Sequence, residues 1–176
     1  MDLQPADSVD RVETGLFQLG EGGLAVNLDH DGCAPEVMRA RIDELKDQLI
    51  ALNGANGAEL PVEHVVADGM YLRKLFMPKG TLLVGKIHLK SCLNIVAFGD
   101  ISVLTELGSA RIKSGAVGVS GRGIQKVGFA HEDTMFINVF RTDEIDIEKI
   151  EAEIASEVHV QVELPGAQAK ELLRGD

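Results

Sequence analysis

The sequence has few cysteines and no long apolar run. Its 176 residues include two cysteines, Cys33 and Cys92, which are too few for a disulfide framework, so we interpret both as reduced thiols. No apolar run approaches the roughly 20 residues that a membrane-spanning helix requires. Disulfide-stabilised secreted proteins and membrane-spanning proteins are therefore both disfavoured, and we expect no membrane partner.

Positive charge is also scarce. The chain carries 17 lysine and arginine residues against 28 aspartate and glutamate residues, which gives a formal net charge of −11. Nucleic-acid backbones are bound mainly through Lys and Arg, so this balance argues against a nucleic-acid partner. The first residues, MDLQPADSVDRVE, are acidic and polar. They are unlike a secretory signal or a transit peptide, and we expect a cytoplasmic protein.

Short apolar runs separated by glycines fill residues 78–130. This pattern is typical of a small antiparallel β-barrel or sandwich. Residues 71–77 and 134–140 are predicted to form further strands, and the dipeptide Asp68-Gly69 predicts a turn before the first of them. The sequence therefore predicts a mainly β protein.

Two segments have helical periodicity. Residues 35–52 begin at Pro35, which suits a first helical position. Their apolar stripe consists of Met38, Ile42, Leu45 and Leu49. A second helix is predicted after residues 134–140, with Thr142 or Asp143 as its N-cap. The apolar stripe of this second helix consists of Ile147, Ile150 and Ile154. Each stripe requires a sheet face or a partner subunit to cover it.

The ends of the chain add smaller elements. Alternating apolar residues predict a strand or hairpin arm at 24–28 and a strand at 158–162. Residues 165–174 are predicted to form a short terminal helix. We divide the chain into an N-terminal arm and helix (1–66), a β-barrel (67–142), and a C-terminal helix, strand and short helix (143–176), which together form one compact domain.

Five residues in the central stretch have a regular spacing: Gly80, Lys86, His88, Cys92 and Gly99. The spacing resembles the first motif of the cupin superfamily, which is Gly, five residues, His-x-His, three or four residues, Glu, six residues and Gly. Lys86 takes the place of the first histidine, and Cys92 takes that of the glutamate. His88 matches the second histidine.

A second regular spacing is formed by Gly115, Gly121, Gly123, Lys126 and Ala130. It is similar to the second cupin motif, which is Gly, five residues, Pro-x-Gly, two residues, His, three residues and Asn. Lys126 takes the place of the histidine. The resemblance implies a cupin-type double-stranded β-helix (a jelly-roll barrel) with an N-terminal helix and C-terminal helix and strand attachments. Cupins commonly dimerise through sheet augmentation, so the resemblance also implies a homo-oligomer.

The segments PKGTLLVGKIH and LNIVAFGDISVLTE, with the helix that contains DEIDIEKIE, resemble a group of small cupin-like proteins encoded by bacteriophages and prophages. This resemblance implies the host cytoplasm or the virion as the location. It also implies phage structural proteins as partners.

The cupin resemblance implies a metal site of three imidazoles and a carboxylate inside the barrel. An ammonium group has no lone pair and repels a dication, so Lys86 and Lys126 oppose metal binding. We therefore expect no cofactor. The alternative is a divalent transition metal (Zn, Fe, Ni or Mn) held by His88, Cys92 and His131. Strand alternation from Lys126, however, places His131 on the opposite face of the sheet.

The substitutions also predict a site of another kind. Two residues apart on a strand, Lys86 and His88 point to the same side, and Lys126 would join them from the opposing sheet. In an acidic protein these cations invert the local sign of charge, which suits a small anion such as a carboxylate, a phosphate or a sugar acid. We predict a ligand site formed by Lys86, His88, Cys92 and Lys126.

Two classes of function follow. The leading hypothesis is a phage-type cupin-like barrel with a degenerate metal site, acting as a small-anion binding module or as a structural and assembly module. The alternative is a metal-dependent cupin enzyme, an oxygenase or isomerase, with a His/Cys ligand set. Two further alternatives stay open: the lysines could pair with Glu106 or Asp100 at the barrel mouth, or Cys92 could act as a nucleophile activated by neighbouring cations.

Overall fold

The computed structural model describes residues 32–53, 60–156 and 160–162. The elements are, in chain order, α1 (Pro35–Asn53), β1 (Val62–Ala67), β2 (Met70–Met77), β3 (Leu82–Val84), β4 (Cys92–Phe98), β5 (Asp100–Thr105), β6 (Gly108–Lys113), β7 (Val117–Ser120), β8 (Val127–Ala130), β9 (Thr134–Arg141), α2 (Ile147–Ile154) and β10 (Val160–Val162). In this described part of the chain, no helix is long and apolar enough to cross a membrane. The arm predicted at 24–28 and the helix predicted at 165–174 lie outside it.

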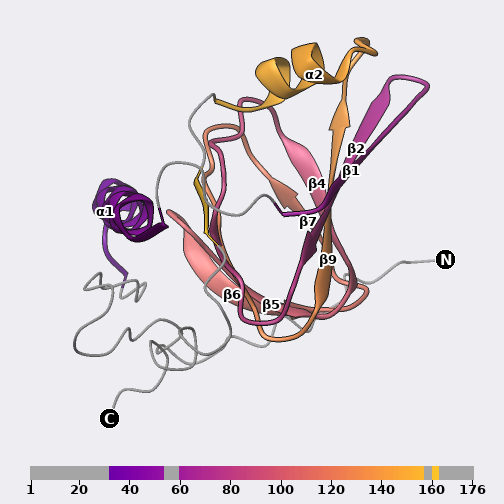
Figure 1. The fold of residues 1–176 in the computed structure, drawn as a ribbon. Coiled ribbons are helices and arrows are strands. Elements are labelled where there is room, and N and C mark those ends of the chain that lie inside the picture. Colours follow the sequence, from indigo (N-terminus) through magenta and orange to yellow (C-terminus); the bar gives the residue numbers. More distant parts are fainter. Residues whose placement is uncertain (1–31, 54–59, 157–159, 163–176) are drawn as a thin grey trace, which may run out of the picture.

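The strands form two five-stranded sheets that enclose a barrel (Figure 1). The strand orders are β1-β2-β9-β4-β7 and β10-β3-β8-β5-β6. Of the eight strands from β2 to β9, the first pairs with the last and the second pairs with the seventh, in both cases antiparallel. This order is that of a jelly roll, the architecture to which cupin barrels belong. The predicted fold class, a mainly β cupin-type barrel with a helix before it and a helix after it, is therefore confirmed.

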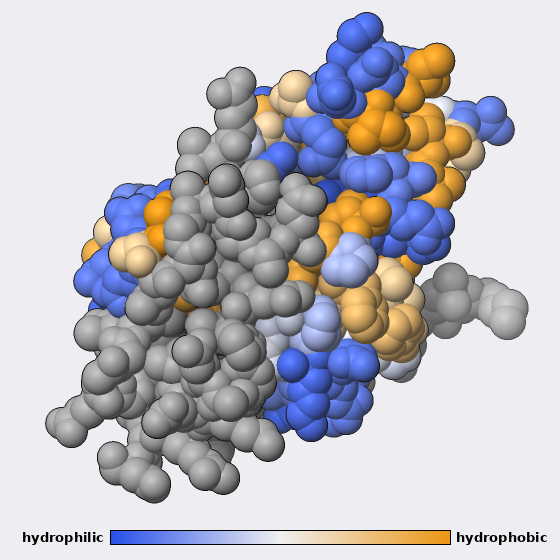
Figure 2. Space-filling model, viewed as in Figure 1, coloured by the Kyte–Doolittle hydropathy of each residue, from blue (hydrophilic) through white to orange (hydrophobic). Residues whose placement is uncertain are grey.

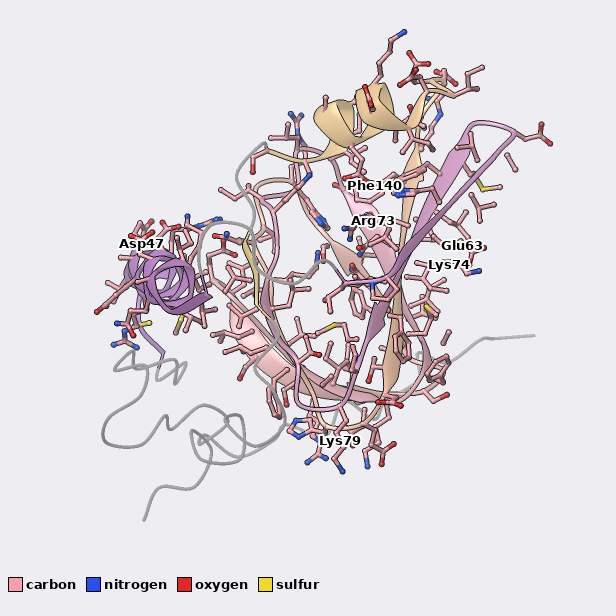
Figure 3. All side chains as sticks on the ribbon, in the orientation of Figure 1. Asp47, Glu63, Arg73, Lys74, Lys79 and Phe140 are labelled. Carbon is pink, nitrogen blue, oxygen red and sulfur yellow. The ribbon has the colours of Figure 1, made fainter. Side chains whose placement is uncertain are left out.

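Side chains alternate between the lumen and the outer surface along each strand. On β2, Tyr71 is buried in the lumen, and Arg73 falls on the same face. Figure 3 shows Arg73 and Phe140 inside the barrel, whereas Lys74 and Glu63 lie on its outer surface. The alternation therefore places the charged side chain of Arg73 in the interior of the barrel. The tight turn before β2 forms as predicted, with Asp68 and Gly69 both at positive φ.

Apolar side chains fill one part of the lumen. They come from both sheets: Leu75, Met77, Val96, Ile101, Ala130 and Phe136. Burying a side chain of the size of leucine or phenylalanine contributes about 1.5–3 kcal/mol. This cluster holds the two sheets together.

The helix α1 packs on the outer face of the second sheet. All four stripe residues predicted from the sequence, Met38, Ile42, Leu45 and Leu49, are 0% exposed. They contact apolar residues of β3, β5 and β8: Leu82, Val84, Leu104, Val127 and Phe129. Figure 1 shows α1 beside this sheet and outside the lumen. The helix therefore covers the barrel and does not line its interior.

The helix α2 covers one end of the barrel (Figure 1). It begins after Asp146, whose side chain accepts a hydrogen bond from the backbone N–H three residues later. The predicted caps, Thr142 and Asp143, are wrong. The hydroxyl of Thr142 instead accepts a hydrogen bond from the backbone N–H of Glu144. Such a local turn competes with helix initiation and moves the start of the helix downstream.

Candidate functional site

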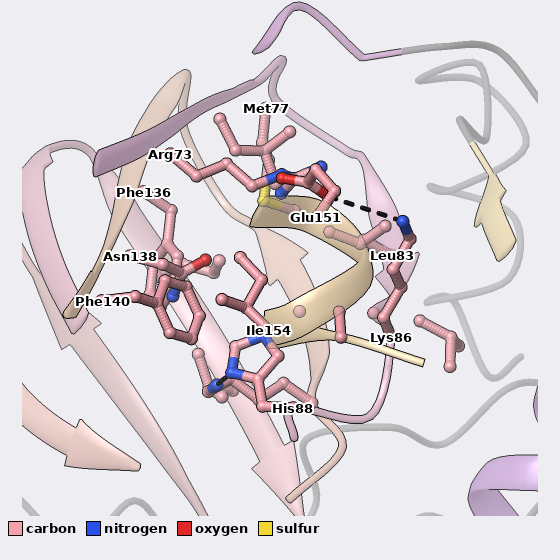
Figure 4. Close-up of a pocket in the computed structure, with 18 residues that line it drawn as sticks. Arg73, Met77, Leu83, Lys86, His88, Phe136, Asn138, Phe140, Glu151 and Ile154 are labelled. Atoms are coloured by element: carbon pink, nitrogen blue, oxygen red, sulfur yellow. Dashed lines mark hydrogen bonds and ion pairs between the residues drawn. The ribbon is translucent and has the colours of Figure 1, made fainter. Parts of the chain in front are cut away.

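A cavity of about 80 Å³ lies in the lumen beneath α2 (Figure 4). Much of its wall is apolar, with contributions from Leu75, Met77, Ile101, Phe136, Phe140 and Ile154. Its polar and charged lining consists of Arg73, Lys86, His88, Lys126, Asn138 and Glu151. A few polar groups converging on an apolar space are typical of a small-ligand site.

The missing side chain of Gly128 helps to keep this space open. Gly128 lines the cavity from β8. A Cβ atom there would lie 3.3 Å from Ile101 Cδ1 and 3.5 Å from Met77 Cε. A larger residue would therefore push against the opposite walls of the lumen.

His88 and Lys126 meet at the cavity wall. His88 is held in place by a β-bridge to Ala155, directly after α2. The Nζ atom of Lys126 lies 3.1 Å from His88 Nδ1. Burial lowers the pKa of His88 to about 3; the charges of Lys126 and Arg73 add to this effect, and that of Glu151 opposes it. The imidazole is therefore neutral, and Nδ1 accepts the hydrogen bond from Lys126.

Cys92 lies behind His88 and does not line the cavity. Its Sγ atom is 3.4 Å from His88 Nδ1 and 3.6 Å from Asn94 Oδ1. Burial raises the pKa of the Cys92 thiol, and the charge of Lys126 opposes that rise without cancelling it. Because the thiolate is the reactive form, this environment does not favour Cys92 as a nucleophile.

Glu151 reaches from α2 to the rim of the cavity, where two cations hold it. Arg73 Nε is 3.4 Å from Glu151 Oε1, and Lys86 Nζ is 3.5 Å from Glu151 Oε2 (Figure 4). The Tyr71 hydroxyl donates a hydrogen bond to Glu151 Oε1 and also contacts His64 Nδ1 at 2.7 Å. Burial acts to raise the pKa of Glu151. The hydrogen bond from Tyr71 and the two cations outweigh burial, so the pKa lies below its ordinary value.

The sequence left open whether the lysines of the site pair with Glu106 or Asp100, and the structure answers this for Lys86. Lys86 pairs with Glu151, not with Glu106 or Asp100. Glu106 forms an ion pair with Arg39 of α1 and also acts electrostatically on Lys126. Asp100 pairs with Arg111, whose hydrogen bond lowers the pKa of the Asp100 carboxyl.

An amide network supports the cavity wall that faces His88. Asn138 Nδ2 donates to Asn94 Oδ1, and Asn94 Nδ2 donates to Ser120 Oγ, each at 2.8 Å. These bonds fix the Asn138 amide. Its oxygen then points toward the cavity (Figure 4).

His131 lies at the opposite end of β8. It follows Lys126 by five residues, which corresponds to roughly 16 Å along an extended strand. Its Nε2 atom is 2.7 Å from Ser102 Oγ, and its ring packs against that of Phe129 at 4.9 Å. The structure therefore brings Lys86, His88, Cys92 and Lys126 to one end of the barrel and does not bring His131 to them.

The residues present do not fit a cupin metal centre. Among the residues that the structure describes, no group of three or more His, Cys, Asp or Glu side chains is placed to hold a metal ion. The amine of Lys126 lies 3.1 Å from His88 Nδ1, one of the two ring nitrogens through which a histidine binds a metal. The ligand set His88, Cys92 and His131 is not assembled, because the alternation of β8 turns His131 to the other face.

Two charged residues of the cavity, Arg73 and Glu151, were not among the sequence candidates. A signal existed for each of them. Arg73 occupies an inward position of the strand predicted at 71–77. Glu151 directly follows Ile150 on the face that the stripe of the second helix defines, because positions i, i+3, i+4 and i+7 share one side of a helix. In both cases the signal is a charged residue at a position on the apolar face of its strand or helix.

No protein-family model matches the chain, and no curated protein matches it. Solved structures with a similar fold include ectoine synthase from P. lautus, with a TM-score of 0.48 and 13% identity over 59% of this chain and 76% of that chain. KdgF from Halomonas sp. has a TM-score of 0.43 and 18% identity over 49% and 81% of the two chains. A cupin-2 domain containing protein from Shewanella frigidimarina has a TM-score of 0.41 and 11% identity over 48% and 83%. These are likenesses of fold, and the fold itself follows from the strand order. The chain is a jelly-roll barrel.

Proposed function

We propose that this protein is a small-anion binding module, in which a cupin-type barrel without its metal ligands holds a small organic anion beneath α2. The observation that carries the proposal is that Arg73 and Lys86 already hold one carboxylate, that of Glu151, at the edge of a cavity of about 80 Å³. A site that binds an internal carboxylate has the chemistry to bind an external one.

The charge around the cavity supports the proposal. Three basic side chains line it (Arg73, Lys86 and Lys126) against one acidic side chain, Glu151, whereas the whole chain has a net charge of −11. A cationic cleft with low-dielectric walls concentrates small anions. Arg73 Nε lies 3.4 Å from Glu151 Oε1, and a guanidinium carries five N–H donors, which is more than one carboxylate can use.

Calorimetric titration of the full chain with acetate, pyruvate, lactate, gluconate and phosphate tests this proposal. We expect at least one of these acids to bind, with affinity that falls about tenfold or more in Lys86→Ala, since removing a direct charged partner costs at least about 1.4 kcal/mol. Lys74→Ala is the matched control because Lys74 lies on the outer surface. If none of the acids gives a binding isotherm with the wild-type protein, the proposal fails.

We also propose that the protein forms a homo-oligomer through β7. This strand is the edge of the first described sheet, and its Val117 and Val119 are 65% and 75% exposed. Figure 2 shows apolar patches between hydrophilic ones on the face in view. An open strand edge with apolar side chains can pair with a second copy. Light scattering after gel filtration should show a dimer or larger species that Val119→Lys dissociates; a monomeric wild-type protein contradicts this.

A bacteriophage context, with virion assembly and phage structural proteins as partners, is part of the proposal. It is supported by the sequence resemblance of residues 78–88 and 93–106.

Elemental analysis of protein purified without chelator distinguishes the enzyme alternative from the anion-binding module. Stoichiometric zinc, iron, nickel or manganese that is lost in His88→Ala would favour the alternative over the anion module.

A further inference from the structure

Lys126 differs from the other basic residues of the cavity. Lys86 and Arg73 face the carboxylate of Glu151, whereas the Lys126 amine faces the neutral Nδ1 atom of His88 at 3.1 Å. A lysine beside an uncharged acceptor gains less from being protonated than a lysine that faces a carboxylate. Burial in an apolar setting shifts such a lysine toward the neutral amine, which is the nucleophilic form.

Burial and two neighbouring groups change the pKa of Lys126. Burial lowers the pKa of Lys126, and the charges of Cys92 and Glu106 act in the opposite direction. The effect of Cys92 requires its thiolate, and burial raises the pKa of that thiol. At neutral pH Cys92 is therefore uncharged, which leaves Glu106 as the carboxylate that favours the ammonium form.

The cavity has groups that could contact both a carboxylate and a second functional group of the same small ligand. Arg73, Lys86, Lys126 and Glu151 all line the same cavity of about 80 Å³. An anion held by Arg73 and Lys86 in place of Glu151 would have its remaining atoms in the same cavity as the Lys126 amine. Gly128, two residues further along the inward face of β8, lines the same cavity and has no side chain to fill it.

We propose that Lys126 forms a Schiff base with short 2-oxo acids, whose carboxylate is held by Arg73 and Lys86. The carboxylate part of this inference rests on the proposed function, and the covalent step goes beyond it. His88 has a positioning role. Its Nδ1 accepts one hydrogen of the amine, which directs the nitrogen lone pair away from the imidazole.

The step balances without another reagent. The neutral amine adds to the carbonyl carbon, a C–N bond forms, and the π electrons of the carbonyl move to its oxygen. The C–O bond then breaks. The two hydrogens of the amine leave with the oxygen as water, and a C=N bond remains. Nothing is oxidised or reduced.

Reductive trapping tests the inference. The full chain is incubated with pyruvate and sodium cyanoborohydride, which reduces an imine to a stable amine, and the modified lysine is located by peptide mass spectrometry. We expect an adduct at Lys126 at least tenfold above that at any other lysine. Lys126→Arg keeps a long basic side chain but has no amine that can form an imine, so it abolishes the adduct. Lys113→Arg is the matched control, because the Lys113 side chain is 72% exposed outside the cavity, and it leaves the adduct unchanged.

A second measurement does not depend on the folding of a variant. Excess acetate has a carboxylate but no reactive carbonyl, so it should suppress the trapping of pyruvate on the wild-type protein. Equal labelling of all surface lysines, or no label at Lys126, overturns the inference. Acids that bind in calorimetry while Lys126 stays unlabelled reject the Schiff base and leave the anion site standing. Labelling of Lys126 by propanal as strong as that by pyruvate rejects the role of the carboxylate and with it the substrate class.

Discussion

The two helices cover the same barrel in different ways. The buried stripe of α1 is wholly apolar and lies on the outside of a sheet. The helix α2 also buries apolar residues, Ile150 and Ile154, but between them it directs Glu151 to two cations at the cavity rim. A helix that only covers apolar surface does not need a carboxylate at that position. The difference assigns α1 to the scaffold and α2 to the site, and each prediction below tests that division.

The largest effect is expected on α1. Leu45 is fully buried against the second sheet, and Leu45→Ala should lower the free energy of unfolding by about 2–5 kcal/mol through lost burial and the cavity that remains. Urea denaturation followed by circular dichroism measures this. Glu44→Ala, on the exposed side of the same helix, should change it by no more than about 0.5 kcal/mol. Equal losses in the two variants would show that α1 is not anchored by its stripe.

The next effect concerns the site end and depends on pH. The folded pKa of His88 is about 3 against 6.5 for the free side chain, so the unfolded chain binds a proton first. Stability contributed by the neutral His88 is therefore present above pH 6.5 and is lost as the pH falls toward 3. At pH 5 the loss amounts to about 2 kcal/mol, from about 1.36 kcal/mol per pH unit.

Denaturation at pH 7.5 and pH 5 of the wild type and of His88→Gln measures this contribution. The variant should lose less stability between the two values than the wild type. Burial also lowers the pKa of His131, and that contribution remains in the variant. An identical pH dependence in the two proteins would mean that His88 takes up its proton in the folded state without penalty.

A smaller effect is expected when the internal carboxylate is removed. Glu151→Gln leaves Arg73 and Lys86 without their negative partner, so an external acid no longer has to displace it. We expect about tenfold tighter binding of small carboxylates, or about 1.4 kcal/mol, measured by the same calorimetric titration. Glu153→Gln is the matched control, because Glu153 pairs with Lys90 outside the cavity. Weaker binding in Glu151→Gln would instead make Glu151 a direct part of the ligand site.

The sequence predicts local features of this molecule better than the contacts that make the site. Glycine-spaced runs and helical periodicity are local, and they are sufficient for the barrel and for the stripe of α1. The partners of Glu151 come from β2 and from the segment after β3, and the contact of Lys126 with His88 joins residues 38 apart. Such pairs are defined only when the sheets close. The wrong N-cap of α2 has a similar cause, because several residues before the helix suit a cap and only the turn at Thr142 decides among them.

The smallest effect is expected one residue away from the site on the same strand. Lys74 pairs with Glu63 on the outer surface at 2.7 Å, and Lys74→Ala should change the free energy of unfolding by no more than about 0.5 kcal/mol. Arg73→Ala removes the same charge from the inner face and should abolish binding of small carboxylates, which Lys74→Ala should leave intact. Titration of both variants in the same buffer measures this difference. If the two substitutions weaken binding equally, the anion responds to the overall charge of the protein and not to the cavity. In that case α2, like α1, only covers apolar surface of the barrel.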